Sequence, residues 1–146
     1  MKIVILTSNA LRHKFLANTL SSHCDDALII SECKPQSQSF DDSKGISEID
    51  NHFLLRDETE KSFFPNDSYF IPKTIPVLYK EANSAFVYQS IKNFKPDVMF
   101  VFGSSIIKEP LISVLPAGHI INLHLGLSPY YRGSGTNFWP FVNNEL

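Results

Sequence analysis

The chain has 146 residues and a formal net charge of -2, with 43% hydrophobic and 19% charged residues. These values indicate one soluble globular domain and exclude a disordered chain. No excess of basic residues indicates nucleic acid as the main partner, and no apolar run is long enough to cross a bilayer.

The first part of the chain alternates apolar runs with a segment of helical period. KIVILTS (2–8) is the near-continuous apolar run of a strand that is covered on both faces. Because this run is too short for the core of a signal peptide, we expect a cytoplasmic protein with reduced cysteines. Apolar residues at helical spacing follow over 10–23, with Asn9 as a candidate N-cap, and ALIIS (27–31) predicts the second strand.

The pattern weakens in the middle of the chain. Seven of the 15 acidic residues fall between Asp41 and Glu60, which indicates a solvated excursion with one helix near 48–64. Periodicity returns at TIPVLY (74–79). A helix is then predicted over 83–96, with Asn83 as its candidate cap and Pro96 as its stop.

VMFVF (98–102) is the clearest buried strand, and HIINLHL (119–125) predicts another. Strands that alternate with helices favour an α/β fold around a parallel sheet. Ligands of such sheets bind outside the carboxyl ends of the strands. We therefore expect the loops SNALRH (8–13) and GSSII (103–107) to share that edge.

Asn122 and His124 stand two residues apart in the last predicted strand, so their side chains should point to the same face. One interpretation is a polar strand end with a satisfied histidine. The other is chemistry, because histidine transfers protons near neutral pH and an asparagine amide can stabilise an oxyanion. Spacing alone leaves both open.

The stretch NLHLGLSPYYRG (122–133) resembles the signature of the folate-dependent formyltransferases, which include glycinamide ribonucleotide and methionyl-tRNA formyltransferases. In that family an Asn-x-His pair ends a strand and leads through a Ser-Leu-Leu-Pro loop to Arg-Gly. Three residues here depart from the usual loop, namely Leu125, Gly126 and Ser128. The resemblance extends back over 96–125 and, more weakly, over 2–15, whereas 34–71 matches nothing in the family.

The resemblance implies a Rossmann-like three-layer α/β sandwich with a mostly parallel sheet. It also implies transfer of a formyl group from 10-formyltetrahydrofolate to an amine. Asn122 would hydrogen-bond the oxyanion, and His124 would stabilise it or assist proton movement. The folate-side loop would be Ser104, Ser105, Ile106 and Ile107, and the acceptor side would include Ser8, Asn9, Arg12 and Arg132.

The family also uses an aspartate a few tens of residues after the histidine, beyond Leu146. We therefore expect 1–146 to be a single catalytic domain that is incomplete at its C-terminus, lacks the last strands and is inactive alone. A short inactive relative is the alternative. His13, His23, His52 and His119 form no ligand cluster, so we predict no metal.

An amino sugar on a nucleotide is the expected acceptor, because several family members of that type resemble SPYYRG (128–133). Glycinamide ribonucleotide comes next. We disfavour tRNA, since the chain is not basic and has no room for the extra domain of tRNA formyltransferases. The alternatives are a formyltetrahydrofolate hydrolase and a non-catalytic folate- or nucleotide-binding relative. We expect no nucleic-acid or membrane partner, and homo-oligomers are compatible with the sequence.

Overall fold

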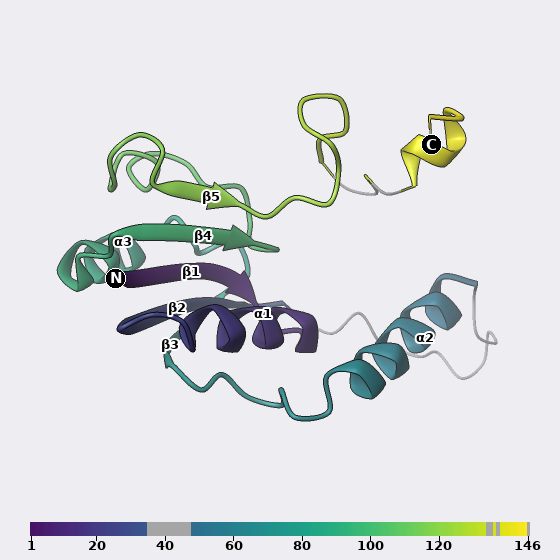
Figure 1. The fold of residues 1–146 in the computed structure, drawn as a ribbon, viewed down its shortest axis with the longest axis horizontal. Helices are drawn as coiled ribbons and strands as arrows, with labels where there is room; N and C mark the ends of the chain where they lie inside the picture. Colours follow the sequence, from purple (N-terminus) through teal and green to yellow (C-terminus); the bar gives the residue numbers. More distant parts are fainter. Residues whose placement is uncertain (35–47, 134–135, 137, 146) are drawn as a thin grey trace.

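The computed structural model describes residues 1–34, 48–133, 136 and 138–145. Its strands and helices alternate through most of the chain (Figure 1). In chain order they are β1 (Lys2–Ser8), α1 (Leu11–Ser21), β2 (Asp26–Cys33), α2 (Glu48–Phe63), β3 (Lys73–Leu78), α3 (Ala85–Phe94), β4 (Val98–Phe102), β5 (Ile120–Asn122) and α4 (Trp139–Val142).

The five strands form one sheet in the order β3-β2-β1-β4-β5, and every pairing is parallel. The expected parallel α/β sheet is therefore confirmed. In register, Thr7 lies opposite Phe102, and Val101 lies opposite Asn122. The carboxyl ends of β1, β4 and β5 thus stand at one level, and their outgoing loops leave from one edge.

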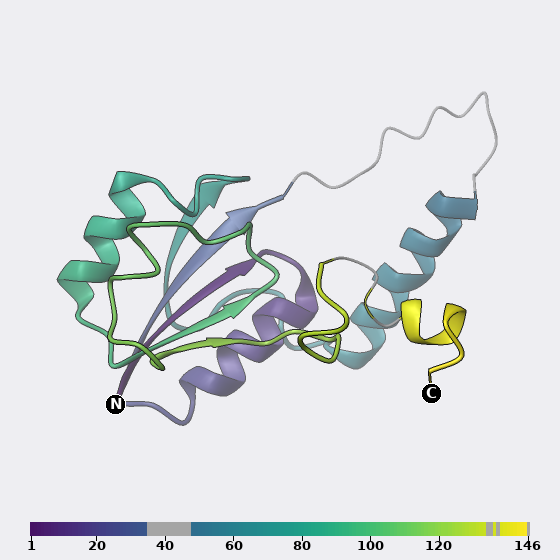
Figure 2. The same ribbon diagram turned by 90° about the horizontal axis from the view of Figure 1, so that it is seen from above.

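Both faces of the central strands β1 and β2 are buried, which is why these strands read as near-continuous apolar runs. Ile3 and Ile5 point to the face that Ala17 of α1 covers. Val4 and Leu6 point to the opposite face, under Val87 and Ile91 of α3 and under Leu111. The result is a three-layer sandwich, with α1 and α3 on opposite sides (Figures 1 and 2).

Two segments extend away from this sandwich. The helix expected near 48–64 is α2, and it lies beyond the carboxyl end of the sheet (Figure 2). α2 contacts α1 through an Arg12–Glu60 ion pair, and Phe64, just after α2, stacks on Phe15 with ring centroids 4.7 Å apart. The segment after β5 also continues past this edge to α4. None of the described helices is long and apolar enough to span a membrane.

The last strand is shorter than predicted. HIINLHL (119–125) was expected to pair throughout, but β5 ends at Asn122. Its neighbour β4 ends at Phe102, and Gly103 leaves the sheet with φ +73°. Beyond Asn122, the Leu123 N–H still donates to the Val101 carbonyl at 2.9 Å. His124 therefore lies in the outgoing loop and not in the strand.

Both predicted helix caps are wrong. Ala10, without a side-chain bond, is the N-cap of α1, and the Asn9 Oδ1 accepts the Lys34 N–H at 3.3 Å. Ser84 caps α3 by accepting the Val87 N–H. Asn83 instead bonds a distant loop. In both cases the amide side chain finds a long-range partner in place of the local one.

Candidate active site

Asn122 and His124, the expected reactive pair, lie at and just after the end of β5. Asn122 is exposed, and His124 is half-buried. The His124 Nδ1 lies 3.2 Å from the amide nitrogen and 3.1 Å from the carbonyl oxygen of Gly126. The loop backbone thus holds the ring through Nδ1.

The loop expected to face folate follows β4 and is held from several sides. The Ser105 N–H and Oγ both donate to Glu32, at 2.7 and 3.0 Å. The Ile106 carbonyl accepts from the Asn83 side chain, while the Ile106 side chain is 82% exposed. Ser104 Oγ donates to the Ser105 carbonyl, and Ile107 packs against the core. This loop therefore has a defined shape and presents Ile106 outward.

The residues expected on the acceptor side do not form an open phosphate cradle. Ser8 is buried, with its Oγ 2.6 Å from the Nδ1 of His13. Asn9 is engaged with Lys34, and the Arg12 guanidinium is paired with Glu60. An incoming anion would have to share Arg12 with this carboxylate. Arg132 is exposed in the segment after β5.

His13 is a buried residue that is not among the predicted site residues. Burial, together with the charges of Arg12, Lys34 and Arg56, lowers the pKa of His13 to about 3. Its ring packs on Phe102, with centroids 4.7 Å apart, and lies directly against Gly103. A neutral imidazole therefore forms the floor beneath the start of the loop after β4.

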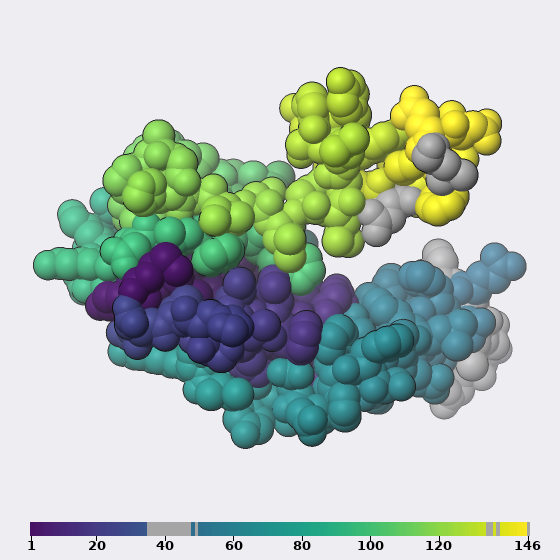
Figure 3. Space-filling model, in the orientation of Figure 1, coloured from purple at the N-terminus to yellow at the C-terminus, as the bar shows by residue number. Residues whose placement is uncertain are grey.

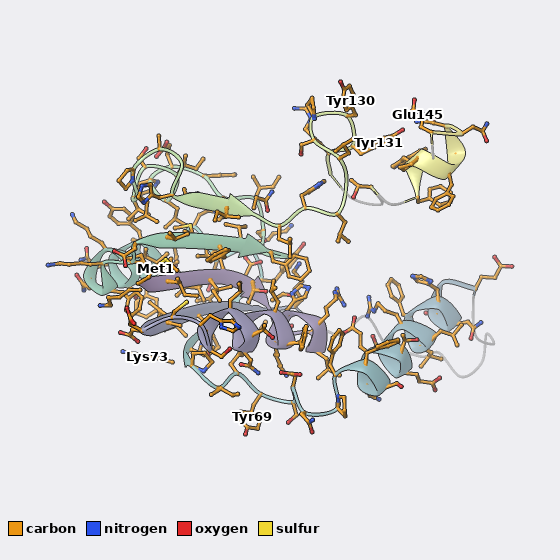
Figure 4. The ribbon with its side chains drawn as sticks, viewed as in Figure 1. Met1, Tyr69, Lys73, Tyr130, Tyr131 and Glu145 are labelled. Carbon is orange, nitrogen blue, oxygen red and sulfur yellow. The ribbon has the colours of Figure 1, made fainter. Side chains whose placement is uncertain are left out.

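The segment after β5 carries two neighbouring tyrosines, Tyr130 and Tyr131. Tyr131 points toward Glu145 and donates a hydrogen bond to its carboxylate, while the Asn143 amide bonds the same hydroxyl (Figure 4). This contact with Glu145 raises the pKa of Tyr131. Tyr130 is 79% exposed. Figure 3 shows open space between this segment and the body formed by α1 and α2.

A pocket lies elsewhere on the carboxyl edge. It has a volume of about 510 Å³ and lies beside the ends of β2 and β3, lined by residues that include Cys33, Leu78 and Phe86. None of the expected site residues lines it. Within the described part of the chain, no group of three His, Cys, Asp or Glu side chains could hold a metal ion.

Comparison with solved structures gives the class of fold. Phosphoribosylglycinamide formyltransferase from Anaplasma phagocytophilum matches 98% of this chain and 58% of its own length, with a TM-score of 0.59 and 14% identity. The enzyme of the same name from Bacillus halodurans matches 99% of this chain and 66% of its own length, with a TM-score of 0.57 and 17% identity. The sheet and its flanking helices therefore have the Rossmann-like α/β fold of the formyltransferases.

Sequence comparison agrees with the fold. Methionyl-tRNA formyltransferase of Alkaliphilus oremlandii is 35% identical over 86 residues, which are 59% of this chain and 26% of the relative. Bifunctional polymyxin resistance protein ArnA of Wigglesworthia glossinidia brevipalpis is 32% identical over 103 residues, which are 68% of this chain and 15% of the relative. No protein-family model matches the chain.

The chain is thus related in both sequence and fold to the formyltransferase superfamily. It spans about a quarter of the length of the methionyl-tRNA formyltransferase that it matches.

Proposed function

We propose that the protein is a formyltransferase that moves a formyl group from 10-formyltetrahydrofolate to an amine. The observation that carries this proposal is the placement of Asn122 and His124. They leave the sheet beside the loop after β4, at the level where Val101 pairs with Asn122. This juxtaposition occurs on a formyltransferase fold and within a stretch that resembles the family signature.

The donor supplies an activated formyl carbon. In the proposed reaction the amine nitrogen forms a bond to that carbon, the bond from the carbon to N10 breaks, and the amine proton is transferred to N10. Asn122 would donate an amide N–H to the negative charge that develops on the formyl oxygen. His124, fixed through Nδ1 by Gly126, would use Nε2 to stabilise the same charge or to move the proton.

The donor would lie against the loop of Ser104, Ser105, Ile106 and Ile107. The polar groups of Ser105 and the Ile106 carbonyl are already bonded within the protein. Recognition of the pterin would therefore fall to other backbone groups of this loop and to the exposed Ile106 side chain. Such a preformed loop suits a rigid aromatic ligand, because little conformational entropy is lost on binding.

For the acceptor we propose an amino sugar carried on a nucleotide, on the strength of the resemblance at SPYYRG (128–133). Arg132 is exposed and Arg12 is half-exposed, so both can reach an anion, although Arg12 would have to share its charge with Glu60. Methionyl-tRNA is the second candidate, since relatives of that name match the sequence. We further propose a cytoplasmic protein and no metal requirement.

The experiment uses the protein as the cell makes it and measures tetrahydrofolate release. Nucleotide-linked amino sugars, glycinamide ribonucleotide and methionyl-tRNA are offered in turn, with an assay without acceptor to detect hydrolysis. We expect release that depends on an amino sugar. Release without any acceptor would indicate a hydrolase, and folate binding without release would indicate a binding domain. Either outcome would contradict the proposed reaction.

Substitution of the reactive pair links that activity to the site. Asn122→Ala and His124→Ala should each lower turnover by about 10²–10³-fold, the usual effect of losing an oxyanion donor. His119→Ala is the control, because this histidine is exposed and its Nδ1 bonds the Asp97 carbonyl away from the pair. Near-normal turnover in Asn122→Ala and His124→Ala would show that this pair does not carry the reaction.

A further inference from the structure

Glu32 is a buried carboxylate at the carboxyl end of β2. The strand is otherwise apolar through Ala27–Ile30, and Glu32 is only 1% exposed. A carboxylate removed from water in this way is costly unless hydrogen bonds compensate it. Its partners therefore indicate why the fold retains it.

The two oxygens of Glu32 serve two different loops. Oε1 accepts the N–H groups of Lys80 and Ala82 at 3.1 and 3.3 Å, in the connection between β3 and α3. Oε2 accepts the N–H and Oγ of Ser105 at 2.7 and 3.0 Å, in the loop after β4. All four donors match an ionised carboxylate, which can only accept. Glu32 thus joins two loops that are 73 and 48 to 50 residues away in sequence.

Two further side chains, Asn83 and Lys34, hold the same loop. Asn83 donates to the Ile106 carbonyl at 2.9 Å and accepts the Lys108 N–H at 2.7 Å. The Lys34 ammonium, two residues beyond Glu32, donates to the Gly103 carbonyl at 2.8 Å. The loop is therefore attached at Gly103, Ser105, Ile106 and Lys108, and Glu32 is the buried centre of the set.

The turn bound by Glu32 is held against its intrinsic preference. Lys80 has φ +72°, a left-handed conformation that is unfavourable for a residue with a side chain. Its N–H is one of the three backbone N–H groups from which Glu32 accepts a hydrogen bond. The carboxylate thus stabilises a specific conformation of both loops and does more than fill space.

We propose that Glu32 is a positioning residue for the formyl donor, which fixes the loop of Ser104–Ile107 in the shape that binds the pterin. This inference rests on the proposed function, since it assigns Glu32 to the same site. Glu32 itself touches neither reactant in this scheme. It acts through the backbone of Ser105 and the connection that carries Asn83.

Glu32→Gln is the discriminating variant, because it preserves size and removes one acceptor oxygen. In either orientation the Gln amide turns an NH₂ toward two donors, so one of the two loops loses its bonds. Ser105→Ala is the graded comparison, since it removes the Oγ bond and keeps the N–H bond. Glu81→Gln is the matched control, because it makes the same change at an exposed position of the neighbouring loop.

Stability needs a separate control. Ile5→Val removes one methylene from the core on the opposite face of the sheet from α3 and leaves the loops unchanged. If its melting temperature falls as far as that of Glu32→Gln, the two variants share a loss of stability, but only Glu32→Gln has lost hydrogen bonds of residue 32 to the two loops. Comparing them separates positioning of the loop from a general loss of folding.

The experiment measures binding of 5-formyltetrahydrofolate, a stable analogue of the donor, together with amide hydrogen exchange over 103–108. Glu32→Gln should weaken binding about tenfold or more and speed exchange in this loop, with exchange in α1 unchanged. Ser105→Ala should show a smaller shift, and Ile5→Val and Glu81→Gln should bind as the unsubstituted protein does.

The outcomes are distinguishable. If the unsubstituted protein does not bind the folate, the proposed function fails, and the assignment of Glu32 to donor binding fails with it. If it binds and Glu32→Gln binds equally well, only the inference about Glu32 is overturned. If Ile5→Val loses affinity as much as Glu32→Gln at equal stability, the role of Glu32 is general folding and the inference is likewise overturned.

Discussion

Substitution of Gly103 by alanine tests how closely the first helix and the loop after β4 fit. Gly103 has φ +73°, and an added Cβ would lie 2.1 Å from the Cε1 of His13. His13 is buried, with its Nδ1 bonded to Ser8 and its ring packed on Phe102. The variant therefore combines backbone strain with a steric clash.

The backbone strain and the steric clash each have an expected effect on the free energy of unfolding. A left-handed conformation costs alanine about 1–2 kcal/mol, and overpacking a filled core costs about 1–3 kcal/mol. Gly103→Ala should therefore destabilise the fold by about 2–5 kcal/mol, a large part of the stability of a typical domain. Gly118→Ala is the matched control, since Gly118 has φ +85° but nothing lies within 4 Å of an added Cβ. It should show the strain term alone.

Urea unfolding followed by circular dichroism measures both variants. We expect Gly103→Ala to be less stable than Gly118→Ala by about 1–3 kcal/mol, because only Gly103 meets a neighbour. In a chain that already carries His13→Ala, the loss of stability caused by Gly103→Ala should be smaller, since the clashing ring is gone. Equal stability of the two glycine variants would refute the close packing of His13 beneath this loop.

Three further predictions concern folding stability. Burial holds the pKa of His13 at about 3 in the folded chain, against 6.5 for a free histidine. As the pH falls, the unfolded chain therefore binds a proton at this residue before the folded chain does. Stability should therefore decline between pH 6.5 and about 3, by up to about 5 kcal/mol from this group. Chemical unfolding across this range should show a shallower decline for His13→Asn, and parallel curves would contradict the assignment. Ala10→Ser should raise the melting temperature, because it supplies the missing N-cap of α1 and is worth about 0.5–2 kcal/mol; no change would mean that the N-terminal turn of α1 is already satisfied. Ser84→Ala should destabilise α3 by about 1 kcal/mol, whereas the same change at the exposed Ser113 should have little effect, and equal effects would contradict a capping role.

The central strands of the sheet could be predicted from the sequence, because a strand that is buried on both faces consists of consecutive apolar residues. The predicted strand 98–102 coincides with β4, and KIVILTS (2–8) coincides with β1. ALIIS (27–31) marks the centre of β2, which extends to Asp26 and Cys33. Burial alone is enough to explain these strands, and burial is visible in the sequence as an apolar run.

The end of β5 could not be predicted, because the length of a strand depends on its partner. HIINLHL (119–125) is apolar enough to continue, but β4 stops at Phe102 and leaves nothing for the later residues to pair with. The residues of one strand do not show where the neighbouring strand ends.

The hydrogen bonds that hold the loop after β4 could not be predicted from the sequence, because they join residues that are far apart in the chain. Glu32 bonds residues 48 to 73 positions away, and Asn83 bonds residues 23 and 25 positions away. One local signal was present, since an acidic residue directly follows the apolar run ALIIS (27–31). A charge at the end of a covered strand indicates a buried partner set, although it does not identify the partners.

The strand order has a consequence for how this protein is made. β1 emerges from the ribosome first but lies at the centre of the sheet, and it contacts a strand that is synthesised much later. The Thr7 hydroxyl bonds the Phe102 carbonyl, 95 positions along the chain. At translation rates of about 5–20 residues per second, one edge of β1 has no partner for roughly 5–20 s. During that interval an apolar strand with free backbone groups must be shielded by the nascent chain or by a chaperone, so slower elongation between β2 and β4 should increase aggregation during synthesis.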